Sequence, residues 1–327
     1  MIKKKICIYP FTKNEEYLIQ YCSELEEFKI DCICTLPRMN KKINMKFFEQ
    51  KNIKIYDDFD NIDLDNIDIL FVPMIFLQVS NLNEIEYNIR KAKEHNIDII
   101  REDTSLNNYS AISLKEIPIP VIGVVAENKF CEDTKFTIKL KKIFQQNGLK
   151  VAIISDKIIY TLFQNKELIL NNEIDYSTDN IIKYNELIYD IYRLEQPDII
   201  IVNLKESIYP LYNIQNDNIG KTYKTISSAI PFDYTFLCLN YRKYDDNIYE
   251  SIINRCSKNV NGTINAIVLS NYFRDWISFY DNKNNRFLRI DNEEVLNEVK
   301  SSKYYVPIIS INEDDDYIKS ILEKELG

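Results

Sequence analysis

Glycine is scarce in this sequence, where only five of 327 residues are glycines. Backbone that wraps closely around a phosphate usually needs glycine, because a side chain would hold the ligand away from the amides. Neither the GxGxxG pattern of dinucleotide sites nor the GxxxxGK[ST] pattern of phosphate loops occurs. The sequence therefore excludes a standard glycine-rich nucleotide site and leaves room only for a degenerate one.

Positive charge and long apolar runs are also in short supply. The chain has 41 Lys and Arg against 50 Asp and Glu, a formal net charge of −9. Sequence-independent binding to nucleic acid depends on many Lys and Arg contacts to phosphate, so we expect no nucleic-acid partner. No segment approaches the roughly 18 consecutive apolar residues of a membrane helix. The short apolar run near the start ends at Pro10, so we expect no signal peptide, no membrane contact and a cytoplasmic protein.

Histidine and cysteine offer little material for metal or thiol chemistry. His95 is the single histidine, and the seven cysteines are scattered, which favours reduced thiols. Cys32 and Cys34 alternate along one face of a predicted strand, a pattern typical of buried thiols. We therefore expect no metal site. Cys131 precedes a predicted helix, where a thiolate gains stability, but two neighbouring carboxylates oppose it.

Apolar runs of strand length alternate with helical patterns through most of the chain, which predicts α/β architecture with mostly parallel sheets. We expect a Rossmann-like or flavodoxin-like domain over residues 1–115 and a second α/β domain over residues 116–327. The Pro-containing segment "LKEIPIP" (114–120) is the predicted linker. Predicted strands are 5–10, 29–36, 53–56, 67–72, 97–101, 121–126, 150–155, 198–203, 234–240, 263–269 and 304–310; predicted helices are 14–28, 83–95, 134–147, 180–194, 247–259, 292–300 and 316–326.

The stretch "GVVAENKFCEDTKFTIKLKK" (123–142) has the form of a strand, a turn and a helix. Aligned with a phosphate loop, it places Lys135 at the lysine position and Lys129 and Thr134 at the two glycine positions. Phe136 falls where a magnesium-binding hydroxyl belongs. Thr137 follows one residue later, about 100° further around the helix, so it cannot simply substitute. No cofactor is certain, and the candidate is ATP with Mg²⁺.

Two carboxylates, Glu132 and Asp133, begin that predicted helix at the point where a phosphate would lie. A helix N-terminus favours anions, so these side chains partly neutralise it and repel a nucleotide. One interpretation is an ordinary N-terminal charge pair on a helix whose apolar stripe faces the core. The other is retained nucleotide binding, in which the lysines at 129, 135 and 139 offset the repulsion.

Polar residues follow the next two predicted strands. Asp156 comes after the strand at 150–155 and Asn203 ends the strand at 198–203, and ligands of open α/β sheets gather at such carboxyl ends. A nucleotide hydrolase carries an acidic residue near the position of Asn203, which is neutral. We add Asp156 and Asn203 to the candidate nucleotide-binding residues and doubt a catalytic metal.

A tyrosine-rich stretch, residues 206–234, is predicted to be a loop at the same edge of the sheet. It interleaves Tyr209, Tyr212 and Tyr223 with lysines, and tyrosine is a frequent anchor in recognition surfaces. We take these three tyrosines as candidate partner-binding residues. The alternative is a tyrosine-rich loop with no binding role.

The order of "IPVIGVVAENKFCEDTKFTIKLKKIFQQNGLKVAIISDK", "EQPDIIIVNL", "FDYTFLCLNY", "GTINAIVLSNYF" and "YYVPIISI" resembles the P-loop NTPase domain of the dethiobiotin-synthetase and MinD-like group. As a whole the chain resembles the clostridial peptide-maturation-system proteins, companions of radical SAM enzymes in ribosomal peptide clusters. The resemblance implies a C-terminal P-loop-NTPase-like parallel sheet and an accessory role in peptide maturation. Of the P-loop residues, only Lys135 transfers directly.

Three functional hypotheses follow. The first is an accessory protein that binds a precursor peptide, or the radical SAM enzyme that modifies it, on a degenerate P-loop scaffold. The second is an ATP-dependent and Mg²⁺-dependent enzyme of the same pathway, such as a ligase or a phosphotransferase. The third is a homodimeric scaffold with neither ligand.

Overall fold

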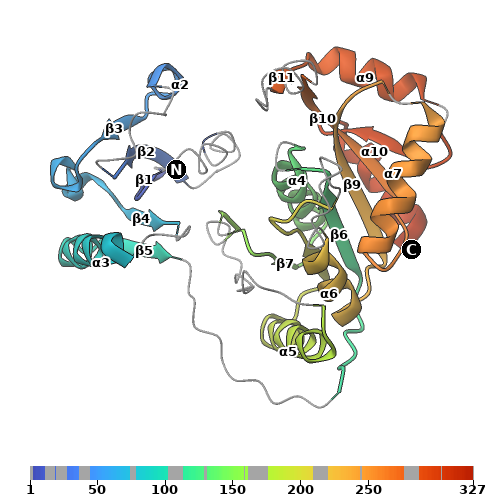
Figure 1. The fold of residues 1–327 in the computed structure, drawn as a ribbon, viewed down its shortest axis with the longest axis horizontal. Helices are drawn as coiled ribbons and strands as arrows, with labels where there is room; N and C mark the ends of the chain where they lie inside the picture. Colours follow the sequence, from blue (N-terminus) through green and yellow to red (C-terminus); the bar gives the residue numbers. More distant parts are fainter. Residues whose placement is uncertain are drawn as a thin grey trace. The chain divides into compact units, whose positions relative to one another are not determined.

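The chain divides into two compact units in a computed structural model, Met1–Ser105 and Leu106–Gly327 (Figure 1). The first unit ends ahead of the boundary expected after residue 115. The residues described are 3–11, 19, 28–36, 45–73, 79–101, 113–128, 131–157, 159–160, 176–208, 220–243, 245–275, 287–302 and 304–326. The predicted helix at 14–28 lies almost entirely outside them.

The first unit contains one five-stranded sheet in the order β3-β2-β1-β4-β5, with every pair of neighbouring strands parallel. From β1 the strands run outward to β2 and β3 on one side and to β4 and β5 on the other, as in a doubly wound α/β fold. The elements are β1 (Lys4–Ile8), β2 (Phe28–Cys34), α2 (Met45–Gln50), β3 (Lys54–Tyr56), the 3-10 turns η4 (Phe59–Asn61) and η5 (Leu64–Asn66), β4 (Ile69–Val72), α3 (Val79–Glu94) and β5 (Asp98–Arg101).

Thiols form part of the core of this unit. Cys7 on β1 lies beside Cys32 on β2, and both side chains are buried together with that of Cys34. A hydrogen bond with Cys32, together with burial, raises the pKa of the Cys7 thiol well above its ordinary value. The cysteines therefore pack as small apolar side chains, as their alternation along the strand indicated.

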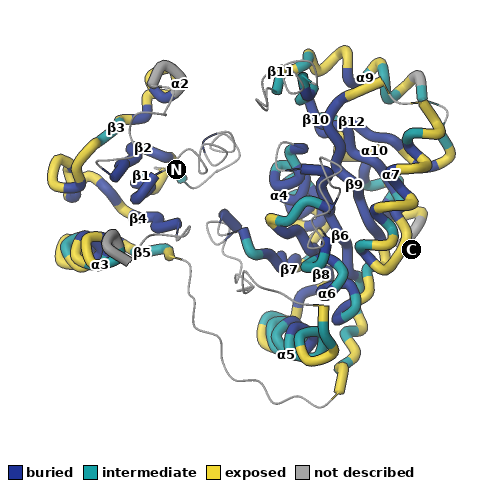
Figure 2. Tube along the Cα trace, viewed as in Figure 1, coloured by how far each residue is buried: buried dark blue, intermediate teal, exposed yellow. Residues whose placement is uncertain are grey.

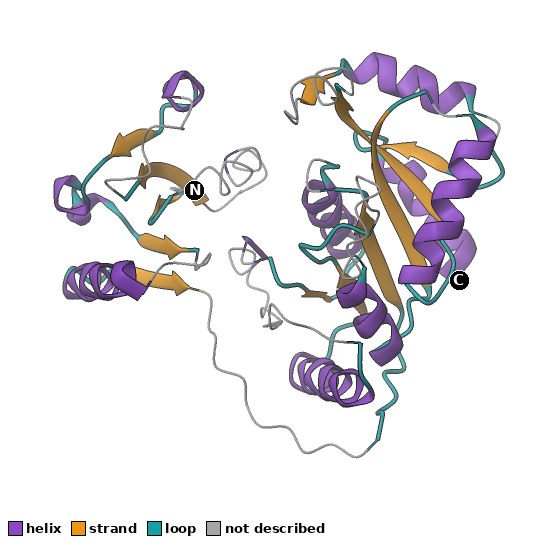
Figure 3. Cartoon of the chain, viewed as in Figure 1, coloured by secondary structure: helices purple, strands orange, loops and turns teal. Residues whose placement is uncertain are grey.

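The second unit holds a sheet with helices packed along it (Figure 3). This seven-stranded sheet has the order β11-β10-β9-β6-β8-β7, with β12 also paired to β10. All its pairs are parallel except β10 with β11. Its elements are β6 (Val121–Ala126), α4 (Asp133–Gln146), β7 (Val151–Ile154), α5 (Thr178–Glu195), β8 (Ile199–Val202), α6 (Lys221–Ala229), β9 (Tyr234–Tyr241), α7 (Asp246–Asn259), β10 (Ala266–Arg274), β11 (Phe287–Arg289), α9 (Asn292–Ser301), β12 (Ile308–Ser310) and α10 (Asp315–Leu326).

The central strands of this sheet are buried along their whole length (Figure 2). Continuous apolar sequences such as "VIGVVA" and "IIIV" are typical of parallel strands whose two faces are both covered. Polar residues appear where the strands end, at Ser155, Asn203, Asn240 and Asn271, and all four are buried. The carboxyl edge of the sheet is therefore a buried polar layer, and the candidate site lies in it.

The secondary structure agrees closely with the pattern of the sequence. The start of α5 at Thr178 is two residues ahead of the predicted start, and the other predicted helices of this unit begin closer to their predicted positions. The sequence did not predict α2 or β11, and β12 begins at Ile308, four residues after its predicted start. It also missed α6, because residues 221–229 were expected to belong to a loop. Gly220 precedes this helix in the left-handed conformation, and the side chain of Tyr223 packs inward from it. Among the described residues, no helix is long and apolar enough to cross a membrane.

Candidate functional site

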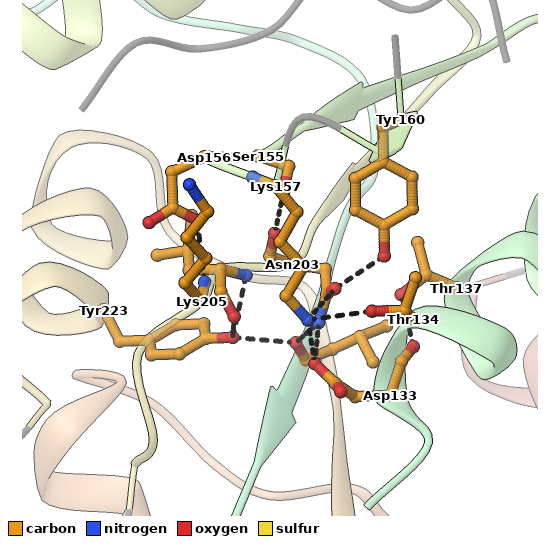
Figure 4. A network of polar contacts seen from close by, with 12 residues as sticks. Asp133, Thr134, Thr137, Ser155, Asp156, Lys157, Tyr160, Asn203, Lys205 and Tyr223 are labelled. Carbon is orange, nitrogen blue, oxygen red and sulfur yellow. Dashed lines mark hydrogen bonds and ion pairs between the residues drawn. The ribbon is translucent and has the colours of Figure 1, made fainter. Parts of the chain in front are cut away.

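The candidate site lies where the carboxyl ends of β6, β7 and β8 meet the N-terminus of α4 (Figure 4). Its centre is a buried ion pair between Lys157, which follows β7, and Asp133, the first residue of α4. The side chains are only 9% and 4% exposed. Taking two charges out of water is costly, so the pair must be supported by further hydrogen bonds.

Lys157 has a full set of partners. Its ammonium group donates to a carboxylate oxygen of Asp133, to the hydroxyl of Thr134 at 3.1 Å and to the side-chain oxygen of Asn203 at 2.8 Å. An ammonium group has three hydrogens, and three acceptors surround this one. No hydrogen of Lys157 is left for a ligand in this arrangement.

Asn203 is saturated in the same way. Its amide nitrogen donates to the carbonyl of Val124 and to Asp133, each at 2.8 Å. Its amide oxygen accepts from Lys157 and from the hydroxyl of Tyr160 at 2.6 Å. A hydrolase holds an acidic residue at this position. Here the amide of Asn203, after β8, instead links β6, the segment after β7 and the start of α4.

The segment after β7 holds Lys157 in place. The hydroxyl of Ser155 donates to the carbonyl of Asn203 at 2.5 Å and accepts from the backbone N–H of Lys157 at 2.9 Å. Burial, and then the charge of Asp133, raise the pKa of Tyr160 well above its ordinary value, so its hydroxyl stays protonated and donates. Within the network the positive charge of Lys157 is paired with the negative charge of Asp133.

Two more carboxylates of the loop after β6 also find partners within the protein. Glu132 accepts the backbone N–H of Asn271 at 2.8 Å, and Glu127 accepts that of Asn240 at 3.3 Å. Glu132 has φ 54, the left-handed conformation that usually requires glycine or asparagine. In a phosphate loop, backbone amides and a lysine point at the anion of the ligand. Here Asp133 supplies the anion for Lys157, and Glu127 and Glu132 accept backbone N–H groups of β9 and β10.

The structure brings only some of the predicted nucleotide-binding residues together. Thr134 and Asn203 belong to the network around Lys157. Thr137 is buried, and its hydroxyl donates to the carbonyl of Asp133 at 2.9 Å, within its own helix. Asp156 lies beside the network and accepts the backbone N–H of Lys205 at 2.7 Å, while burial raises its pKa. Lys129 lies outside the described residues.

Lys135 points away from this network. Its ammonium group donates to the side-chain oxygen of Asn312 at 3.0 Å and lies 3.8 Å from Glu132. Two residues of helix separate it from Asp133, a rotation of about 200°, so the two side chains leave α4 in different directions. Lys139, one turn later, pairs with Asp315 at 3.1 Å. The two lysines thus tie α4 to the start of α10, and Lys135 is separate from the network around Lys157.

The structure places Tyr223, one of the three candidate partner-binding tyrosines, inside the second unit. Its side chain is fully buried in α6. The hydroxyl donates to the carbonyl of Val124 at 3.1 Å and accepts the backbone N–H of Leu204 at 2.9 Å. The hydroxyl of Tyr223 therefore links the backbone of β6 to that of the segment after β8. Tyr209 and Tyr212 lie outside the described residues.

Burial also decides the state of Cys131. The thiol is completely buried, and burial followed by the charge of Glu127 raises its pKa well above the ordinary value. A reactive thiolate is therefore disfavoured, as the neighbouring carboxylates suggested. Over the described ranges, no group of three or more His, Cys, Asp and Glu side chains is arranged to hold a metal ion.

The residue that sequence reasoning missed is Lys157. It follows Asp156 directly in "IISDK", at the end of a predicted strand, which was the available signal. The spacing of the phosphate-loop pattern directed attention to Lys135 instead. A lysine from another strand can reach the helix N-terminus only once the sheet order is known.

Fold and site together define a class of protein: a two-unit α/β protein in which the carboxylates around the loop between β6 and α4 are bound by groups of the chain itself. A DUF1611 family protein from Anabaena variabilis is similar over 98% of this chain and 100% of its own, with a TM-score of 0.62 and 8% identity. At that identity the likeness shows a shared fold across both units.

Partial likenesses extend to nucleotide-binding proteins. The MinD cell division protein of Aquifex aeolicus is 13% identical over 63% of this chain and 87% of its own, with a TM-score of 0.32. A nucleotide-binding protein in complex with ADP from Archaeoglobus fulgidus is 12% identical over 62% of this chain and 84% of its own, with a TM-score of 0.31. Both scores are too low to bear on function. No family model and no curated protein matches the sequence.

The buried ion pair yields a double-mutant prediction. Lys157→Met and Asp133→Ala should each lower the free energy of unfolding by about 3–5 kcal/mol, because each leaves an uncompensated buried charge. The double variant should lose less than the sum of the two, since no charge remains unpaired. Urea denaturation measures all three, with the half-exposed Lys319→Met as the control. Additive losses would contradict a coupled pair.

Tyr223→Phe tests the buried hydroxyl. It leaves the N–H of Leu204 without its acceptor, so the free energy of unfolding should fall by about 1–3 kcal/mol. Tyr317→Phe, at a half-exposed ring on α10, should change it by less than about 0.5 kcal/mol. Thermal and urea unfolding of both variants provide the measurement, and equal effects would show that the hydroxyl of Tyr223 is dispensable.

Glu127→Gln tests the buried carboxyl through pH. Burial raises the pKa of Glu127 above its ordinary 4.5, although the N–H of Asn240 and the charges of Arg274 and Arg242 lower it. As pH rises past about 4.5, the unfolded chain releases this proton before the folded one, so wild-type stability falls relative to Glu127→Gln. Between acid and neutral pH, the free energy of unfolding of Glu127→Gln should increasingly exceed that of the wild type. A constant difference would contradict the prediction.

Proposed function

We propose that this protein is a non-catalytic accessory protein that binds a precursor peptide, or the enzyme that modifies it, during maturation of a ribosomally synthesised peptide. The observation that carries the non-catalytic part is the closed polar layer at α4, where Asp133 takes the hydrogen bonds that a phosphate would need. The protein keeps a P-loop-like scaffold and uses it for binding.

Phosphoryl transfer needs a cradle of amides, a free lysine and an acidic residue that holds Mg²⁺ or positions the nucleophile. Lys157 donates its three ammonium hydrogens to Asp133, Thr134 and Asn203. A nucleotide phosphate would have to displace Asp133 and break a buried pair, which costs about 3–5 kcal/mol when one partner is lost. That cost opposes nucleotide binding and favours the accessory role over an ATP-dependent ligase or phosphotransferase.

The assignment to peptide maturation has a different basis. It depends on the resemblance of the chain, in the order of its strand and helix segments, to the clostridial peptide-maturation-system proteins. It implies a cytoplasmic protein encoded near a radical SAM enzyme and a short precursor peptide. The whole-chain likeness to a DUF1611 protein is compatible with this proposal, because a shared fold leaves the function open.

The first experiment is a calorimetric titration of MgATP into the full chain and into Lys135→Ala. We expect no binding in the micromolar range and no ATP hydrolysis in either protein, because the loop's own carboxylates hold the donors. Micromolar binding that Lys135→Ala abolishes would overturn the proposal in favour of the ATP-dependent enzyme.

The positive test uses the short peptide encoded beside the gene. We expect the labelled synthetic peptide to bind the wild-type chain, with fluorescence anisotropy as the readout. The same peptide in scrambled order is the control. Equal affinity for both sequences, or none for either, would contradict a precursor-binding role.

A further inference from the structure

An extended segment precedes β6 in the second unit. Residues 114–120, which we call the pre-β6 segment, form neither a helix nor a strand. Its two prolines bias the residue before each of them to extended backbone. Exposed and half-buried residues alternate along it, in the order Leu114, Lys115, Glu116, Ile117, Pro118 and Ile119. A period of two is that of an extended chain with one side against the protein.

Contacts with the rest of the second unit hold this segment in place. Asn185 on α5 accepts the backbone N–H of Lys115 at 2.7 Å and donates to its carbonyl at 2.9 Å. The ammonium group of Lys115 pairs with Glu186 at 3.1 Å. Further along, Ile117 and Ile119 pack against the core of the unit. The pre-β6 segment is therefore a fixed part of the surface of this unit.

A groove with a volume of about 860 Å³ lies beside the pre-β6 segment. Sites for small ligands typically measure about 300–1,000 Å³ and are mostly apolar. The whole segment contributes to the lining of the groove, and most of the lining residues are apolar. The remainder of the lining comes from α5 and from the stretch between the end of α6 and β9: Asn185, Ser228, Ala229, Ile230, Pro231 and Asp233.

The middle of the pre-β6 segment has backbone groups without partners. Lys115 uses both its N–H and its carbonyl on Asn185. In the part of the chain that the structure describes, the N–H and C=O groups of Glu116, Ile117 and Ile119 have no hydrogen-bond partner. Backbone N–H and C=O groups are strong hydrogen-bonding groups, which proteins usually pair. The groove therefore has free donors and acceptors of an extended backbone beside an apolar lining.

We propose that this groove binds an extended, apolar peptide segment, which pairs through its main chain with residues 116–119 and places side chains against the apolar lining. An extended peptide that joins an exposed stretch of backbone gains main-chain hydrogen bonds and side-chain contacts together, so one ligand accounts for both features of the groove. The inference rests on the proposed function, in which the partner is a peptide or an enzyme, and it names the conformation and chemistry of the recognised segment.

A second copy of the same segment fits the groove less well. The commonest dimer is two-fold symmetric and joins a surface to itself. Pro118 and Pro120 have no N–H, so two paired pre-β6 segments would both be short of donors. Such a pair would also bring together the two copies of Glu116. A peptide with few prolines supplies an N–H at almost every residue and avoids both problems.

The test uses a short fluorescein-labelled peptide in which Val and Thr alternate between two terminal lysines, a composition with high strand propensity. Fluorescence anisotropy measures its binding to the full chain, which we expect in the micromolar range. An ester analogue, whose central backbone N–H groups are replaced by oxygen, should bind about tenfold more weakly because it lacks the donors. Both peptides carry the same lysines, so attraction to a chain of net charge −9 is common to them. Equal affinity would overturn main-chain pairing.

Two variants of the protein test the location. Leu114→Ser removes an exposed apolar side chain from the lining and should weaken binding about fivefold. Ser228→Phe, near the end of α6, should fill part of the groove and abolish binding. Circular dichroism checks that both variants fold.

Matched controls make the same exchanges away from the groove. They are Leu194→Ser on α5, at a leucine that is 65% exposed, and Ser320→Phe on α10. Equal losses in groove and control variants, or no binding of the alternating peptide to the wild type, would overturn the proposal. So would light scattering that shows a wild-type dimer dissociated by Ser228→Phe, because the occupant would then be a second copy.

Failure of this inference and failure of the proposed function give different results. If the peptide encoded beside the gene binds the wild type and Leu114→Ser equally well, the accessory role stands and the groove is not its site. If the alternating peptide binds as expected and the encoded peptide does not bind, the groove stands and the precursor-binding role fails.

Discussion

The buried pair of Asp133 and Lys157 is the interaction on which the carboxyl edge of the second sheet depends. Two charges in a low-dielectric layer are tolerated only when every hydrogen and lone pair is used. Thr134 and Asn203 meet this requirement by accepting hydrogen bonds from Lys157. Asn203 in turn accepts a hydrogen bond from the hydroxyl of Tyr160. Because the pair joins a residue after β7 to the first residue of α4, it also sets where the loop after β6 can run.

The same network explains how the loop between β6 and α4 is held without glycine. Backbone N–H groups at strand ends need acceptors. Glu132 and Glu127 accept those of Asn271 on β10 and Asn240 on β9. The carboxylates at the two ends of this loop therefore fasten it to other strands of the sheet, while Asp133 pairs with Lys157 at the start of α4.

Much of the fold could be predicted from the sequence, because strands such as β6 and β8 are uninterrupted apolar runs and helices such as α7 have clear caps. The chain's own periodicity carries that information. The helix α6 was missed because Gly220 begins it and a tyrosine-rich composition suggested a loop. For the site, Thr134 and Asn203 were found as strand-end and helix-start residues, while Lys157 was not.

By itself, the sequence determined the α/β class, the burial of the thiols and the absence of a standard phosphate loop, since composition and local spacing decide these. Only the tertiary structure decided which lysine meets Asp133. Sheet order places β8 beside β6 and β7 beyond β8, and helical rotation turns Lys135 toward Asn312. The direction of Tyr223 was decided the same way, because a ring on α6 becomes core or surface only when the helix packs on the sheet. Contacts between residues far apart in the chain produce no periodic pattern in the sequence, so they cannot be predicted from it.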